Sequence, residues 1–381
     1  MNYLAVDLYH DFECIADACP NTCCAGWRIT IDQATCKKMI EHQDALGVPA
    51  SDWLIEQNGS TVAKLYNQRC AMLNEDNLCN VVLKLGPEYL SDTCKLYPRK
   101  CQQYGSVLEL HLTASCPDVV AKLMDKEFVQ FDFSEDTTPA PYYPYTQLYL
   151  FESAVRSSIF DLLQGMPEVK LITRIFAAFH ILDKAIQLYS NEQPDFDLLK
   201  PHIGSYFQRE ILLSLDERLH NIVNETKRYA FLQQLQTVMC ENVSNDRFGE
   251  LIMQSYRYFQ ENNLEKYLSD ITEFRANIQE YHAFYTNYWV YRMFPDLLTI
   301  PEYDASKEKM LYIAMEFCCI QILALASFVS NKKLDRDEYI YIISGISRLM
   351  EHNTSFRQQA IDKLRQNDLV SAAGLLLLIL I

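Results

Sequence analysis

Cysteine is distributed very unevenly along this chain. Ten of its thirteen cysteines lie in the first 116 residues, and four of them fall within the stretch Cys14–Trp27. Such a density of thiols constrains the fold, because it is typical of a disulfide scaffold, a zinc site or an iron–sulfur centre. The rest of the chain has only Cys240, Cys318 and Cys319, which we expect to be small buried hydrophobic residues.

The N-terminus lacks the basic segment and apolar core of a secretory signal peptide. The longest apolar run, Leu375–Ile381, is far shorter than the roughly 18–20 residues that span a bilayer, and we expect it to form a buried last helix. These features predict a cytoplasmic protein without a membrane partner. Because reducing compartments rarely keep structural disulfides, the cysteine-rich segment is expected to bind metal or to act in redox chemistry.

Charge and glycine content exclude several classes of function. The formal net charge of -16 argues against a nucleic-acid partner, because phosphate binding needs clustered Lys and Arg. No two of the ten glycines lie within four positions of each other, so the chain has neither a G-x-G-x-x-G turn nor a P-loop. Neither G-x-S-x-G nor H-E-x-x-H occurs, which removes the best-known hydrolase and zinc-protease signatures.

The spacing of the first thiols differs from that of ordinary zinc knuckles, which use paired C-x2-C or C-x4-C ligands. No C-x2-C is present, and Cys23 and Cys24 are adjacent, so their side chains diverge along the backbone. The C-x3-C-x2-C motif of radical adenosylmethionine enzymes fails because its third position is Gly26. A cubane iron–sulfur cluster accepts irregular spacing, since each iron needs one external thiolate. This favours iron–sulfur over zinc and leaves zinc as the alternative.

Hydrophobic periodicity predicts a mainly α fold. Alternation over Trp27–Asp32 and Leu108–Thr113 indicates two short half-buried strands, and Asp32 is placed to cap a following helix. Beyond residue 145, apolar residues recur at three and four positions, as in helices. We therefore predict a small cysteine-rich α+β N-terminal domain with short strands at 1–132, a linker at 133–145 with three prolines, and an irregular all-helical bundle at 146–381.

Four helical segments and three breaks are expected in this body. The segments are Leu148–Leu163, Leu171–Leu188, Ile211–Met239 and Met310–Val329, and the breaks are Gln164–Pro167, Asn191–Pro194 and Phe294–Asp296.

The cysteines of the head fall into four ordered blocks within roughly the first 120 residues. The blocks are Cys14-x4-Cys19-x3-Cys23-Cys24-x-Gly26-Trp27-x-Ile29-x-Ile31-Asp32, then Cys70-x8-Cys79, then Thr93-Cys94-x2-Tyr97-Pro98-Arg99, then Leu112-Thr113-x-Ser115-Cys116-Pro117. This order resembles the flagellin lysine N-methylase family and, more loosely, a broader group of cysteine-cluster proteins thought to chelate zinc or iron.

The resemblance implies methyl transfer from S-adenosylmethionine to lysine side chains of flagellin, in a protein that carries a 4Fe-4S cluster. It also implies that Arg99 lies near the cluster or a carboxylate of the donor, with a structural salt bridge as the alternative role of this arginine. The alternative is a non-enzymatic metal-chelating or electron-carrying protein whose helical body binds a partner. The implied metal ligands are Cys14, Cys19, Cys23, Cys24, Cys70, Cys79, Cys94 and Cys116, whereas Cys36 and Cys101 fall outside the pattern.

Lysine methylation requires the ammonium, whose reference pKa is about 10.4, to lose a proton before it attacks a sulfonium methyl. The aromatic block Tyr281–Phe294 offers a surface for a cation, although such a stripe is more often core. Glu109 and His111 could act as acid–base groups before Cys116, but solvent-exposed strand residues are the commoner reading of this pattern. The catalytic base is therefore left open.

Overall fold

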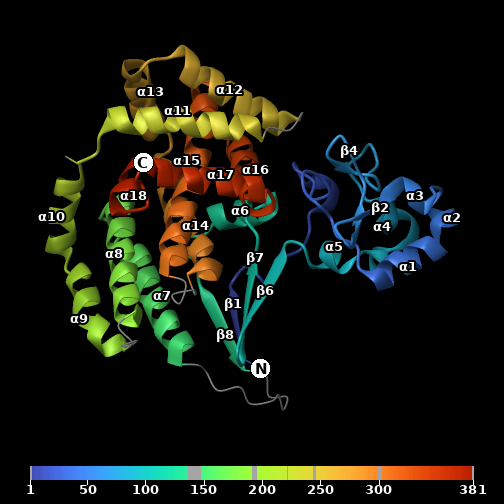
Figure 1. Cartoon of the computed structure of the whole chain (residues 1–381), viewed down its shortest axis with the longest axis horizontal. Coiled ribbons are helices and arrows are strands. Elements are labelled where there is room, and N and C mark those ends of the chain that lie inside the picture. Colours follow the sequence, from blue (N-terminus) through green and yellow to red (C-terminus); the bar gives the residue numbers. More distant parts are fainter. Residues whose placement is uncertain are drawn as a thin grey trace.

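A computed structural model gives the fold of this chain and describes residues 2–135, 147–190, 195–220, 222–242, 246–297 and 303–379. The fold is mainly α, as predicted, with short strands confined to the N-terminal third (Figure 1). The strands are β1 Asn2–Val6, β2 Leu54–Gln57, β3 Ser60–Ala63, β4 Leu65–Tyr66, β5 Arg69–Cys70, β6 Arg99–Tyr104, β7 Val107–Leu112 and β8 Phe131–Glu135.

Short helices accompany these strands, and long helices follow them. The N-terminal helices are α1 Gln33–Glu41, α2 Gln43–Leu46, α3 Ala50–Trp53, α4 Asn80–Leu85, α5 Asp92–Leu96 and α6 Pro117–Met124. The later helices are α7 Gln147–Gly165, α8 Leu171–Ser190, α9 Phe196–Tyr206, α10 Arg209–His220, α11 Glu225–Glu241, α12 Arg247–Glu261, α13 Leu264–Asn277, α14 His282–Asp296, α15 Tyr303–Asn331, α16 Arg336–His352, α17 Thr354–Gln366 and α18 Ala372–Leu378.

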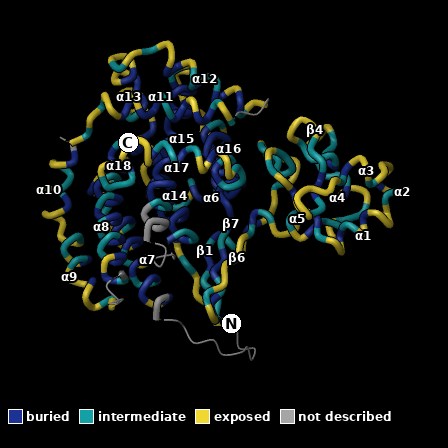
Figure 2. Tube along the Cα trace, viewed as in Figure 1, coloured by how far each residue is buried: buried dark blue, intermediate teal, exposed yellow. Residues whose placement is uncertain are grey.

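Residues 27–96 form a separate small lobe, which we call the cysteine lobe. It contains α1–α5 and the strand pairs β2–β3 and β4–β5, and it lies beside the rest of the molecule on the right of Figure 1. Its core is a small cluster that includes Ile29, Ile31, Met39, Trp53 and Val81. Most of its residues are exposed or half-buried (Figure 2). A core of this size contributes little stability alone, so a lobe of this kind benefits from an added cross-link such as a metal.

The predicted strand at Trp27–Asp32 is wrong. This segment touches β3 at isolated points, with the Ala63 amide donating to the Ile29 carbonyl and the Ile31 amide donating to the Thr61 carbonyl, both at 2.9 Å. Ile29 and Ile31 are buried as the alternation predicts, but no continuous ladder forms. The predicted helix cap is confirmed, because the Asp32 carboxylate accepts from the Thr35 amide at 2.8 Å at the start of α1.

A four-stranded sheet of order β6-β7-β1-β8 joins the N-terminal third to the helical body. The prediction of a strand near Leu108–Thr113 is confirmed by β7, which pairs parallel with β1 and antiparallel with β6. Residues of β1, β7 and α6, including Val6, Leu112 and Val119, belong to the same hydrophobic core as the long helices. The β1–β7–α6 part of the N-terminal third thus shares the core of the long helices, whereas the cysteine lobe has a small core of its own.

The predicted linker at 133–145 overlaps β8 at its first three residues, and the remainder lies outside the described residues. The break at Gln164–Pro167 is confirmed between α7 and α8, whereas Asn191–Pro194 also lies outside the described residues. Ile211–Met239 forms two helices, because Asn224 caps a new one by accepting from the Lys227 amide. The helix expected to break at Phe294–Asp296 runs through Pro295 and ends at Asp296.

Helix α15 occupies the centre of the helical body. Its segment Glu308–Asn331 is apolar and long enough to cross a membrane, but 89% of its most apolar window is buried inside the protein, as in a core helix. The predicted burial of the C-terminal helix is confirmed, since Leu375 and Leu378 of α18 are fully buried. Arg228 of α11 donates to the carbonyls of Leu376, Leu377 and Ile379 and so completes the hydrogen bonding at the end of α18.

Candidate functional site

All thirteen cysteines are free thiols. The three in the helical body are in apolar surroundings as expected, with Cys318 and Cys319 fully buried and Cys240 half-buried beside the sulfur of Met253 at 3.8 Å. Cys36 and Cys101, which fall outside the cysteine pattern, are half-buried and exposed. The eight remaining thiols gather in two neighbourhoods.

The first neighbourhood comprises Cys70, Cys79 and Cys94 of the cysteine lobe and Cys24, which precedes the lobe in the sequence. The Cys70 amide donates to the Cys24 carbonyl at 2.8 Å, while Cys70, Cys79 and Cys94 all pack against the small lobe core. Burial, with smaller contributions from the neighbouring thiols, raises the pKa of Cys70 to about 12 and of Cys94 to about 11. These thiols are therefore neutral at pH 7 unless a cation replaces their protons.

The second neighbourhood lies where the cysteine-rich segment meets the helical body, and it comprises Cys14, Cys19 and Cys116. Cys116 is buried at the start of α6, and burial raises its pKa to about 12 despite the opposing effect of the Val119 and Asp118 amides. Cys19 lies close enough to affect the Cys116 thiol electrostatically. Cys23 connects the two neighbourhoods, because its thiol interacts with that of Cys24 and, like Cys116, with the Tyr97 ring hydroxyl.

Thiol chemistry fits a soft metal or an iron–sulfur cluster, because reduced cysteines supply the thiolates that these groups need. Within the described ranges, no three His, Cys, Asp or Glu side chains come within reach of one metal ion. Binding of a cluster by either neighbourhood would therefore require its loops to draw together.

Arg348 of α16 holds the segment Cys14–Trp27, which we call the cysteine-rich loop, against the helical body. Its terminal nitrogens donate to the carbonyls of Asn21, Thr22, Ala25 and Ser115, and to the Asn21 side-chain oxygen, at 3.0–3.4 Å. The side chain is only 8% exposed. Because two of these acceptors flank Cys23 and Cys24 and another precedes Cys116, this one arginine sets the position of thiols that lie far apart in sequence.

Aromatic stacking provides a second contact between the loop and the helical body. The Trp27 ring stacks between Tyr97, with centroids 5.9 Å apart, and His352 of α16, with centroids 4.6 Å apart. The Trp27 indole also donates to the Cys23 carbonyl at 2.7 Å. Desolvation and the charges of Lys100 and Arg348 lower the pKa of His352 to about 4, so the stacked imidazole is neutral at pH 7.

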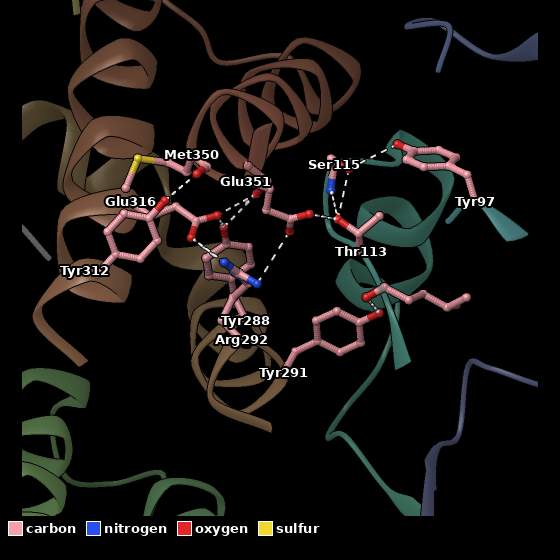
Figure 3. Close-up of polar contacts among 12 residues, drawn as sticks. Tyr97, Thr113, Ser115, Tyr288, Tyr291, Arg292, Tyr312, Glu316, Met350 and Glu351 are labelled. Carbon is pink, nitrogen blue, oxygen red and sulfur yellow. Dashed lines mark hydrogen bonds and ion pairs between the residues drawn. The ribbon is translucent and has the colours of Figure 1, made fainter. Parts of the chain in front are cut away.

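A buried polar network continues from Tyr97 into the helical core (Figure 3). The hydroxyls of Tyr97, Ser115 and Thr113 are linked at 3.1 and 2.9 Å, and Thr113 donates to the carboxylate of Glu351. Glu351 in turn pairs with Arg292 at 3.5 Å. Burial raises the pKa of Glu351 although Arg292 and Thr113 oppose this. A chain of hydroxyls that ends at such a carboxyl is able to pass a proton.

The far end of this network is an ion pair in the centre of the protein. Arg292 of α14 donates to Glu316 of α15 at 2.9 Å, and both side chains are buried. Tyr288 and Ser347 donate to the other oxygen of Glu316 at 2.6 and 2.7 Å. The prediction missed this network, although two signals were present in the sequence: one arginine inside an aromatic block and one glutamate inside an apolar helix.

Three polar residues of the N-terminal third, Arg99, Glu109 and His111, were considered for roles at the site. Arg99 has no acidic partner among the described residues; it donates to the Phe12 carbonyl at 2.7 Å and lies over the rings of Tyr9 and Phe12. Glu109 and His111 were expected to face solvent; this is wrong for Glu109, whereas His111 is half-buried. Glu109 is buried because Arg156 of α7 pairs with it at 2.6 Å, and Tyr149 also donates to it.

Acidification should destabilise the fold through His111. Burial, together with the charges of Arg292 and Lys100, lowers its pKa from 6.5 to about 4. Between these two pH values the unfolded chain binds a proton that the folded chain does not, so the free energy of unfolding falls as the pH drops from 6.5 towards 4. Between pH 7 and 4.5 this histidine should lower the free energy of unfolding of the wild-type chain by about 2–3 kcal/mol. The variant His111→Gln should lack this contribution, as measured by urea unfolding at both pH values. An unchanged pH dependence in the variant would contradict the assignment.

The aromatic block is core, as the commoner reading of such a stripe indicates. From Phe284 to Phe294 every residue of α14 is buried, and the fully buried rings include Tyr285, Tyr288 and Trp289. It is therefore not the open cation-binding face considered from the sequence.

A cavity of about 190 Å³ lies between the cysteine-rich loop and the helical body. Asn21, Ala25 and Gly26 line one side, and residues of the α12 N-terminus and of α16 line the other. Arg348 therefore borders both the thiols and this cavity. The cavity is open to solvent, and its lining includes the carboxylate of Asp246 as well as amide and apolar side chains.

Comparison with known proteins bears on the whole chain. Residues 156–378 match the model of the FliB lysine N-methylase C-terminal domain. The chain belongs to the FliB lysine N-methylase family. A lysine-N-methylase of Salmonella choleraesuis strain SC-B67 and one of Salmonella typhimurium strain LT2 are each 24% identical to it over 410 aligned positions, covering 96% of both chains.

A third relative matches part of the chain only. The flagellar biosynthetic protein FliU of Salmonella muenchen is 34% identical over 121 residues, which cover 30% of this chain and 72% of that protein. No solved structure matches. The FliB family model covers most of the helical body, where the sequence alone offered no specific motif.

Proposed function

We propose that this chain is a protein-lysine N-methyltransferase that transfers methyl groups from S-adenosylmethionine to flagellin. The match of residues 156–378 to the FliB lysine N-methylase domain carries the proposal. Two relatives over nearly the whole length bear the name lysine-N-methylase, and the name of a third refers to the flagellum, which favours flagellin as the substrate. The cysteine pattern resembles the same family, and so supports the proposal independently of the helical body.

An iron–sulfur cluster bound by the eight thiols is part of the proposal, with zinc as the alternative metal. Cys24 and the lobe thiols Cys70, Cys79 and Cys94 would hold one centre. The other centre would be held by Cys14, Cys19, Cys23 and Cys116. Such a cluster supplies iron that can change its redox state or act as a Lewis acid. Burial raises the pKa of Cys19, and the Cys23 side chain together with burial raises the pKa of Cys24, although the charge of Arg348 opposes both shifts, so these thiols would lose their protons only to a bound cation.

The chain must also accept the proton that the substrate lysine loses. The hydroxyl chain from Tyr97 to Glu351 is the buried path that leads from the cysteine-rich loop to a carboxyl group. We assign it to proton transfer within the proposed reaction, with Glu351 as the acceptor.

A methyl-transfer assay tests the function. Anaerobically purified protein, incubated with S-adenosylmethionine and flagellin, should increase the mass of flagellin by one methylene for each modified lysine, and peptide mapping should place the change on lysine side chains. A parallel reaction without S-adenosylmethionine is the control. Flagellin of unchanged mass after incubation with metal-replete protein would refute the proposal and favour the metal-chelating alternative.

If the chain holds two separate metal centres, single cysteine substitutions in the two neighbourhoods should each remove a different part of the bound metal. Cys24→Ser should lose the metal of the lobe neighbourhood, and Cys19→Ser that of the second neighbourhood, each about half of the total measured by metal analysis and absorbance after anaerobic purification. Cys101→Ser, at an exposed thiol outside both neighbourhoods, is the matched control and should retain all of it. Complete loss from either variant would indicate one shared centre.

A further inference from the structure

We propose that the outer edge of β8 is a docking site for an extended, lysine-bearing segment of the protein substrate, which pairs with this strand beside an acidic groove. The kind of partner rests on the proposed function, while the site rests on the geometry of β8 and α7. β8 forms one edge of the four-stranded sheet, on the side of α7 (Figure 1). Among the residues that the structure describes, only β1 pairs with it.

The hydrogen bonding of β8 shows which of its backbone groups face outward. β1 and β8 are antiparallel, and the Asp7 amide donates to the Gln130 carbonyl at 3.0 Å, which makes these two residues a bonded pair. Because bonded and non-bonded pairs alternate along an antiparallel ladder, Phe131, Phe133 and Glu135 direct their amides and carbonyls away from β1. No described segment bonds these outward groups, so they form an open edge that an extended peptide can extend.

Gln164 of α7 shows how this edge is satisfied just before it becomes open. Its side-chain oxygen accepts from the Val129 amide at 2.9 Å, and its side-chain nitrogen donates to the Val129 carbonyl at 3.3 Å. Val129 lies two residues before Phe131 and so directs its backbone to the same side. The side-chain amide therefore bonds the edge as a neighbouring strand would, and an incoming segment would begin beyond it.

A groove of about 490 Å³ between β8 and α7 adjoins this edge. Its lining combines the carboxylates of Asp132 and Asp161 with the aromatic side chains of Phe128, Phe131 and Phe160, and no described lysine, arginine or histidine contributes to it. Carboxylates attract an ammonium group, aromatic rings favour a nearby cation, and apolar surface packs against the aliphatic part of a lysine. The groove thus suits lysine side chains of a segment that is paired with β8.

Charge distinguishes this edge from the opposite edge of the sheet. β6 carries Arg99 and Lys100, and lysine on an edge strand opposes further pairing. β8 instead carries Asp132 and Glu135, and its Phe133 side chain is 57% exposed. A second copy of β8 would bring like charges together, which disfavours self-association through this edge. The acidic strand therefore favours a basic partner over another copy of this chain.

Two variants alter the backbone edge and the groove separately. Phe133→Pro removes one outward amide hydrogen, and Phe133→Leu is its matched control because it keeps the amide and an apolar side chain. Asp132→Asn combined with Asp161→Asn removes both carboxylates of the groove. The control for this pair is Glu261→Gln combined with Glu265→Gln, which makes the same change in net charge at exposed positions on α12 and α13.

Fluorescence anisotropy with a labelled peptide tests docking to the full chain without relying on turnover. The probe is a short capped peptide of alternating lysine and threonine, and the comparison peptide has glutamate in place of lysine. The wild-type chain and both controls should bind the lysine peptide equally, and the glutamate peptide at least about tenfold more weakly. Phe133→Pro and the double aspartate variant should each bind the lysine peptide about fivefold more weakly than the wild-type chain.

Two further measurements accompany the affinities. Circular dichroism and thermal unfolding of each variant establish that the fold is retained. Hydrogen exchange of the wild-type chain should show slower exchange within Phe131–Glu135 when the lysine peptide is bound, because its backbone would cover the outward amides. If Phe133→Pro does not fold, the double aspartate variant and the exchange measurement still decide the question.

The outcomes separate this inference from the proposed function. Equal affinity of every variant for the lysine peptide would overturn the docking site even if flagellin were methylated. Weaker binding by Phe133→Pro and by the double aspartate variant would support the site even if flagellin gained no methyl group. Equal binding of the glutamate peptide, or no binding of either peptide by the wild-type chain, would overturn it. A dimer in sedimentation that Phe133→Pro abolishes would also overturn it, because a second copy would then occupy the edge.

Discussion

Replacing Glu316 with glutamine should lower the free energy of unfolding by about 3 kcal/mol, because it leaves the buried guanidinium of Arg292 without its closest counter-charge. Removing one partner of a buried ion pair usually costs about 3–5 kcal/mol. The lower end applies here, since the Glu351 carboxylate remains 3.5 Å from Arg292. Chemical denaturation at pH 7, with the transition midpoint and slope both fitted, measures the change.

Two further variants separate the charge effect from general disruption. The double variant Arg292→Met, Glu316→Leu removes both charges and should recover most of the lost stability, because a buried pair is often replaceable by apolar residues. Asp125→Asn breaks the exposed pair with Arg336 and should change the free energy of unfolding by less than about 0.5 kcal/mol. Wild-type stability of Glu316→Gln would contradict the assigned role of the pair.

Replacing Arg348 with methionine should reduce the proposed methyl transfer to flagellin about 100-fold, because it removes the five hydrogen bonds by which this arginine of α16 holds the cysteine-rich loop and Ser115. The long helices keep their own core, so the body should remain folded. Limited proteolysis should show faster cleavage within Cys14–Trp27 than in the wild-type chain. Rates are measured by mass spectrometry of flagellin with saturating donor.

Conservative and remote substitutions serve as controls for this prediction. Arg348→Lys keeps the charge but not the planar set of donors, and should give an intermediate rate. Arg365→Met removes an exposed arginine of α17 that pairs with Glu308, and should leave both the rate and the proteolysis pattern unchanged. If Arg348→Met retained the wild-type rate and cleavage pattern, the loop would be held by other contacts, such as the Trp27 stack.

Local patterns in the sequence predicted the positions of helices and strands better than they predicted which side chains contact one another in the fold. Alternation correctly placed β7, but it also suggested that Glu109 faces water, whereas Arg156 pairs with it inside the protein. The pattern cannot show this because the arginine lies on a different element, and a buried carboxylate is tolerated only when such a partner is present. Likewise, the alternation at Ile29 and Ile31 marks their burial but not the few hydrogen bonds that β3 offers.

The sequence by itself determined the mainly α class, the concentration of thiols near the N-terminus and the resemblance to flagellin lysine N-methylases, because each depends on residue type and short-range spacing. Only the tertiary structure decided that Cys24 groups with Cys70, that Arg348 holds the loop of Cys23 and Cys24, and that a cavity adjoins it. These contacts join residues dozens to hundreds of positions apart. They depend on how buried surfaces and charges satisfy one another once the helices pack, which no local pattern encodes.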